Sequence, residues 1–227
     1  MIQKKCQLCS RLSSKFNQLL NRLFGNKLNC QKIHIDTYDS KERIREINEA
    51  ALNCSCEAYI MSQYSPGPVS KSEVISRFVF SPIHTHKKSG DILPSVFSHA
   101  FTKGCSIQRE TKASDDEITQ FVGDFLAVDQ KFSWNGVLVA NCGDLRSINI
   151  DSNKERAFCV YDTADKKNPA HAEFGQSQQI SEADMVELRH DMFMVFSQGK
   201  KILPKDYRNN LCAGMPQSLK PQINLAG

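Results

Sequence analysis

The chain has 227 residues, of which 40% are hydrophobic and 24% charged, and its formal net charge is +4 at pH 7. This composition is typical of a folded globular protein and excludes a wholly disordered chain. No apolar stretch approaches the roughly 20 residues of a transmembrane helix, and so mild a positive charge does not by itself indicate nucleic-acid binding.

The N-terminal residues 1–16 are basic but lack the continuous apolar core of a secretory signal, so a cytoplasmic location is expected. The nine cysteines are then expected to be reduced, as small buried side chains or as metal ligands. Cys6, Cys9, Cys54 and Cys56 form two close pairs that could together hold a structural zinc. The two pairs lie much farther apart than in common zinc ribbons, so free thiols and no cofactor are favoured.

Residues 1–64 are predicted to form a helical module. Apolar residues follow helical spacing in 10–25, and again from about Ser40 to Met61, where Asp39 and Glu42 are placed to cap the helix start. Basic residues lie on and around the first helix: Lys4, Lys5, Arg11, Lys15, Arg22 and Lys27. They are consistent with nucleic-acid binding, and a solvated helix face is the simpler explanation.

Two prolines around Gly67 predict a boundary after this module. The main domain is expected to span 69–203, and a polar tail 204–227. In the main domain we predict five strands, at 77–80, 105–110, 136–142, 156–162 and 171–174, and two helices, at 114–128 and 181–198. Ser114 and Glu117 match a capping box. The order predicts an α+β fold, with a short mixed sheet packed with two or three helices.

One set of polar side chains in the main domain suits a ligand site: Arg77, Ser81, His84, Arg109 and His171. An arginine fixed on a strand can hold a phosphate or a carboxylate through two N–H groups. Such an arginine is costly to bury without an anionic partner. The partner is either a ligand or, in the favoured structural reading, one of three carboxylates of the protein itself: Glu110, Asp162 or Glu173.

The histidines and Cys105 offer further arrangements. His84 and His86 share a face if their segment is extended, so with His99 they could hold a metal or an anion, although a solvated loop explains them more simply. His171 follows an Asn-Pro turn and is expected at a sheet edge. Cys105 could be a nucleophile with His99 or His171 as its base, but a lone cysteine at a strand start is more often packed than reactive.

Four short motifs occur in order along residues 74–198. They are R-x-x-F-S-x-x-H from Arg77, G-x-I-x-P-x-x-F from Gly90, S-x-x-R from Ser106 and P-x-H-A-E from Pro169. In this series the chain resembles a group of small uncharacterised bacterial proteins, for which the resemblance implies no activity. Some proteins of that kind are encoded beside defence or mobile-element systems.

Two functions are therefore weighed. The first is a non-enzymatic accessory or adaptor subunit of a bacterial multi-protein system, for example one of antiviral defence, with protein partners and no membrane. The second is a small metal-independent enzyme acting on a nucleotide or nucleic acid, in which Arg77, Arg109 and Ser81 hold the phosphate while His84 and His171 act as acid and base. The chain has no P-loop, dinucleotide fingerprint, H-E-x-x-H or G-x-S-x-G motif, which disfavours those enzyme classes.

Overall fold

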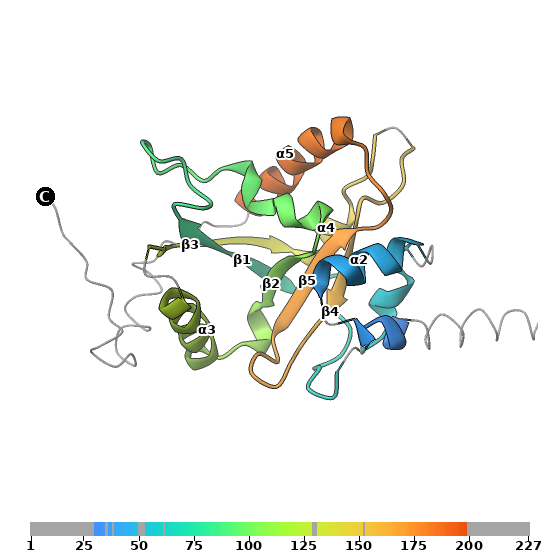
Figure 1. Cartoon of the computed structure of the whole chain (residues 1–227), viewed down its shortest axis with the longest axis horizontal. Coiled ribbons are helices and arrows are strands. Elements are labelled where there is room, and N and C mark those ends of the chain that lie inside the picture. The colour runs from blue at the N-terminus through green and yellow to red at the C-terminus, as the bar shows by residue number, and fades with distance from the viewer. Residues whose placement is uncertain are drawn as a thin grey trace, which may run out of the picture.

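Figure 1 shows the computed structural model of the chain. The structure describes residues 30–34, 36–37, 39–49, 53–60, 62–128, 131–151 and 153–198. The helix predicted at 10–25 and the tail 204–227 lie outside these residues, as do Cys6 and Cys9. In the part of the chain that is described, no helix has the length and apolar character needed to cross a membrane.

A five-stranded sheet forms the centre of the molecule, in the order β3–β1–β2–β5–β4. Its strands are β1 (Val74–Ser81), β2 (Cys105–Arg109), β3 (Ser133–Asn141), β4 (Phe158–Asp162) and β5 (His171–Gln176). The α+β fold class is confirmed. Every neighbouring pair among the described strands is antiparallel, where a mixed sheet was predicted. The turn that joins β4 to β5 is too short for the crossover that a parallel pair would need.

The helical elements are α2 (Ser40–Glu49), α3 (Asp115–Val128), α4 (Cys142–Arg146) and α5 (Glu182–Gln198), and the 3₁₀ helices η1 (Asn53–Ala58), η2 (Pro94–Phe101) and η3 (Glu110–Lys112). Capping at Ser114 is as predicted, because Ser114 and Glu117 exchange hydrogen bonds. The helix predicted from Ser40 to Met61 instead ends at Glu49 and is followed by η1.

The two faces of the sheet are covered by different elements. On one face α5 and η2 pack over a large apolar core that includes Phe97, Phe174 and Phe196. On the other face α3 covers β1 and β3, while α2 and η1 lie against β4 (Figure 1). Because side chains alternate along a strand, neighbouring residues of β1 serve different faces.

The described part of the predicted N-terminal module packs directly on the main sheet. The Arg43 guanidinium pairs with Glu173 of β5 at 2.6 Å. Ile44 lies so close to Gly175 that a Cβ at this glycine would come within 2.7 Å of the Ile44 Cδ1 atom. The disulfide between Cys54 and Cys159 joins η1 to β4. Residues on the two sides of the predicted boundary near 64–69 therefore share one core.

Candidate functional site

Strands β1 and β2 form a fork at Arg77. They pair only at Ile75–Arg109 and Ser76–Gln108. Beyond this point β1 continues along β3, while β2 continues along β5. The guanidinium of Arg77 replaces part of the missing strand pairing, because its Nη1 donates to the Ser106 carbonyl at 3.0 Å and its Nη2 to the Val96 carbonyl at 3.3 Å.

A cleft of about 230 Å³ opens at this fork, and we call it the fork cleft. Its polar side chains are Arg77, His84, His99, Ser106 and Gln108. Its apolar side chains are Phe78, Phe80, Ile83, Ile107, Phe121 and Phe125. The described residues that line the fork cleft include no carboxylate, so the charge of Arg77 is not balanced there.

The aromatic wall of the fork cleft comes from β1 and α3. The rings of Phe80 and Phe125 are stacked with centroids 3.9 Å apart, and those of Phe78 and Phe121 lie 5.3 Å apart. Phe78 and Phe80 point to the α3 side because they are two residues apart on β1. The apolar stripe of α3 that the sequence predicts thus supplies both the core contact and one wall of the cleft.

His84 is held as a neutral hydrogen-bond donor. Its backbone N–H donates to the Phe80 carbonyl at 2.9 Å, and its Nδ1 accepts the Phe80 N–H at 3.0 Å. Burial, followed by the nearby charge of Arg77, lowers the pKa of His84 to about 3. At neutral pH the proton therefore sits on Nε2, since Nδ1 is the acceptor.

His99 lies in η2 and is exposed. Its pKa is lowered by partial burial, then by Lys103 and then by Arg77. Burial is thus the main cause of the lowered pKa in both cleft histidines, and the positive charge of Arg77 lowers the pKa of each of them further. A carboxylate close to Arg77 would offset the effect of its charge on the pKa of these histidines. The fork cleft presents one fixed cation and neutral donors.

Arg109 has a different environment, although it also lies on a strand. It is 1% exposed, and its Nε and Nη2 donate to the two carboxylate oxygens of Glu73 at 2.6 and 2.8 Å. A further N–H donates to the Gly67 carbonyl at 2.7 Å, and Asp162 lies 3.7 Å away. This bidentate pair is structural, as the favoured reading of the sequence has it, and it leaves Arg109 outside the fork cleft.

The other proposed ligand-site residues also lie apart from the fork cleft. The Ser81 hydroxyl accepts from Thr85 at 3.0 Å. His171 is opposite Gln108 across the β2–β5 pair, and its Nδ1 lies 2.8 Å from the Thr163 hydroxyl. Of the five residues singled out from the sequence, the structure brings only Arg77 and His84 together in this cleft.

Cys105 is buried, and burial raises the pKa of its thiol. Its Sγ donates weakly to the Val96 carbonyl at 3.9 Å. A reactive cysteine requires a thiolate that is reachable from solvent. The packed reading of Cys105 therefore fits its surroundings better than the nucleophile reading.

The structure corrects the expectation of reduced cysteines. Cys30 is bonded to Cys56 and Cys54 to Cys159, so the predicted pair Cys54/Cys56 is divided between two disulfides. In this form neither Cys54 nor Cys56 has a thiolate for the zinc considered from the sequence. Cys6 and Cys9, the other two ligands of that hypothesis, lie outside the described residues.

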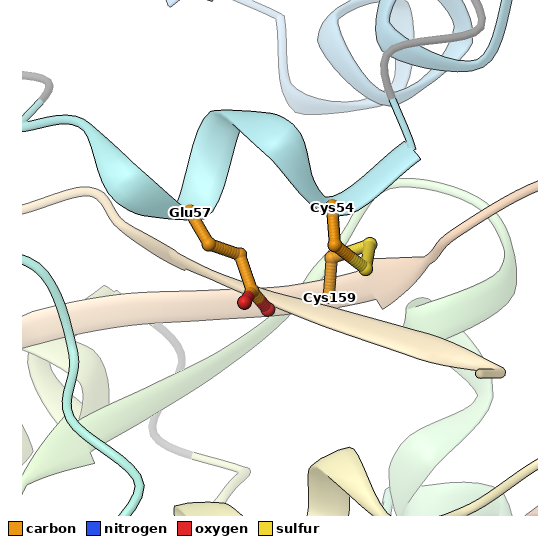
Figure 2. A group of neighbouring side chains, drawn as sticks. All are labelled: Cys54, Glu57 and Cys159. Carbon is orange, nitrogen blue, oxygen red and sulfur yellow. A yellow bond between two sulfur atoms is a disulfide. The ribbon is translucent and has the colours of Figure 1, made fainter.

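Cys54, Cys159 and Glu57 bring three metal-ligating side chains together (Figure 2). The sulfurs are consumed by the disulfide. The Glu57 carboxylate accepts from the backbone N–H of Val160 and pairs with Arg146 and Arg156. Two guanidiniums at the carboxylate and no free thiolate make this group an anchor of η1 on β4 and a poor fit to a metal ion.

Ser106, Gln108 and the aromatic wall are absent from the site predicted from the sequence. Ser106 and Gln108 alternate along a short strand, which identifies a shared face but not what faces it. Phe121 and Phe125 follow a helical apolar stripe that is equally explained by core packing. The sequence groups His99 with His84 and His86 for a metal or an anion, or with Cys105 as its base, and the cleft is lined by His99 and His84 but not by His86 or Cys105. The place of His99 in the cleft follows from η2, which the sequence did not predict.

The comparisons with known proteins give no relationship to build on. No protein-family model, no curated protein and no solved structure matches the chain.

Proposed function

We propose that this protein binds a small anionic ligand in the fork cleft and does so as a non-catalytic accessory subunit. The observation that carries the proposal is Arg77. Its guanidinium lines a largely aromatic cleft, and its hydrogen bonds go to two backbone carbonyls. A cation in such surroundings is costly unless an anion joins it.

The contrast with Arg109 supports this proposal. Arg109 is neutralised by Glu73, which offers both carboxylate oxygens. Arg77 has carbonyl dipoles only, and its buried Nε–H has no acceptor among the described residues. A ligand carboxylate or phosphate at the cleft would give Arg77 the charge compensation that Arg109 obtains within the fold.

The state of His84 supports a binding role over a catalytic one. A general acid or base works best with a pKa near the operating pH. The pKa of His84 is about 3, and its Nδ1 is engaged by the Phe80 N–H. His171, the other acid–base candidate, does not line the cleft.

Replacing Arg77 with glutamine tests the proposal. We expect Arg77→Gln to abolish the saturable chemical-shift changes that phosphate or acetate produces in the amide resonances of β1 and β2. Arg45→Gln is the matched control, because Arg45 is an exposed arginine that pairs with Glu42 and Glu49 far from the fork. Equal responses of both variants and the unmodified protein would contradict an anion site at Arg77.

His99 supports a second candidate, a metal-independent enzyme acting on a phosphate-containing substrate. It lines the cleft, is exposed, and has a lowered pKa, so its neutral ring is available as a base. Turnover of a phosphate ester that is lost in His99→Gln, with the fold retained, would replace the non-catalytic proposal.

The cellular setting stays a prediction from the sequence. An accessory subunit is expected to be recovered with a stoichiometric protein partner when the tagged chain is purified from its native cell. Recovery alone would contradict the subunit role and leave the anion site untouched. The cytoplasmic location also stays a prediction, and the two disulfides argue against it, because such bonds persist mainly in oxidising compartments.

A further inference from the structure

We infer that the ligand of the fork cleft is a monoanion with an aromatic ring, that is, an aromatic carboxylic acid and not a phosphate monoester. This inference rests on the proposed anion site and narrows its ligand class. Three features of the cleft support it: the number of its charges, the composition of its walls and the position of its neutral donors.

The charge count favours a ligand with one negative charge. Among the described lining residues Arg77 is the one permanently charged side chain, and no carboxylate balances it. A phosphate monoester carries about −1.5 to −2 charges at pH 7, which would leave excess negative charge against an aromatic wall. A carboxylate carries a single charge and matches a guanidinium in number and in planar geometry.

The walls favour a planar apolar body. Four phenylalanines line the cleft, and they already form one tilted and one stacked pair with one another. A ligand ring beside them would extend this packing at the separations that aromatic pairs prefer. The volume of about 230 Å³ is below the roughly 300–1,000 Å³ of pockets for drug-sized ligands. It suits one ring with a short acidic arm.

Neutral donors complete the carboxylate site. His84 lines the cleft with its Nδ1 occupied, so its Nε2–H is the remaining ring donor. Two of the five N–H donors of Arg77 are used for backbone carbonyls. The Gln108 amide, which is on the same strand as Ser106, adds a neutral donor and acceptor. None of these neutral groups adds a second positive charge.

Four probes separate the contributions of ring and charge. Titration calorimetry at pH 7 on the full chain would use phenylacetate, phenylacetamide, acetate and phenyl phosphate. Phenylacetate is expected to bind at least about tenfold more tightly than each of the others, because only it joins a ring to a single charge. Arg77→Gln is expected to reduce phenylacetate binding to the level of phenylacetamide.

The outcomes distinguish this inference from the function on which it rests. Tighter binding of phenyl phosphate than of phenylacetate would overturn the monoanion inference and leave the anion site standing. Equal binding of acetate and phenylacetate would overturn the aromatic part alone. If no probe binds, both the inference and the proposed function fail.

A second variant keeps the test valid if Arg77→Gln does not fold. Phe125→Leu keeps an apolar side chain on α3 but removes one ring of the wall. It is expected to weaken phenylacetate severalfold and leave acetate unchanged. Equal losses for both probes would contradict a ligand ring at the aromatic wall.

Discussion

At the scale of single residues, the chemical type of a side chain does not decide its role here. Arg77 and Arg109 are both strand arginines near the same strand pair. What separates them is Glu73, which lies 36 residues before Arg109 and provides both oxygens of its carboxylate. The partners predicted from the sequence are Glu110, Asp162 and Glu173, and of these Asp162 lies 3.7 Å from the Arg109 guanidinium, while the bidentate partner is Glu73. Long-range pairing of this kind cannot be read from local spacing.

His84 predicts a loss of stability in acid. Its pKa in the folded protein is about 3, against an ordinary value of 6.5, so the unfolded chain takes up a proton first as the pH falls. This contribution is complete above pH 6.5 and declines by roughly 1.4 kcal/mol per pH unit below it. At pH 5 the loss amounts to about 2 kcal/mol.

Urea denaturation at pH 7 and pH 5 measures this effect. His84→Asn keeps an acceptor for the Phe80 N–H and removes the titrating ring. The decrease in the free energy of unfolding between pH 7 and pH 5 should therefore be smaller in this variant by about 2 kcal/mol. His34 also has a pKa of about 3, so part of the fall remains. His86→Asn, an exposed neighbour, is the control. An unchanged fall in His84→Asn would contradict a neutral buried His84.

At the scale of elements, periodicity succeeded where each element has one buried face. Helices α3 and α5 and all five strands lie where the apolar patterns place them. The patterns failed for η2 and α4, which are too short for a period to be seen, and at Glu49, where α2 ends. The fork depends on how far β1 and β2 stay paired, and no local pattern reports that extent. This is why the sequence found Arg77 and His84 but not their cleft.

Packing of α2 on β5 can be tested with one glycine. A Cβ at Gly175 would lie 2.7 Å from the Ile44 Cδ1 atom, so Gly175→Ala should lower the free energy of unfolding by about 1–3 kcal/mol. Ile44→Val removes the clashing methyl group. The same Gly175→Ala change should therefore cost clearly less in an Ile44→Val background.

A double-mutant cycle by urea denaturation gives this difference directly. Additive effects of the two changes would mean that the Ile44 Cδ1 atom does not lie against Gly175. The cycle needs no assumption about residues 1–29, because Ile44 and Gly175 both belong to described elements.

At the scale of the whole molecule, two disulfides stabilise the region between α2, η1 and β4, where the apolar core is small. The core between α2, η1 and β4 contains six buried residues, and three of them are the half-cystines Cys30, Cys56 and Cys159. Ionic contacts add to it, since Glu57 joins Arg146 and Arg156, and Arg43 joins Glu173. We therefore expect the disulfides to carry much of the stability of this attachment.

The two disulfides should differ in their contributions to stability. In the chain-entropy description a bond that closes a longer loop restricts the unfolded chain more. Cys54–Cys159 spans 105 residues and Cys30–Cys56 spans 26, which corresponds to about 4.7 and about 3.5 kcal/mol. Urea denaturation of Cys54→Ala/Cys159→Ala and of Cys30→Ala/Cys56→Ala should thus show the larger loss for the first pair.

The free, buried Cys105 and Cys142 should resist alkylation until the chain unfolds. Peptide mapping without reductant that finds Cys54 and Cys159 alkylated would refute the link between η1 and β4, and the attachment would then depend on the ionic contacts of Glu57 and Arg43 alone.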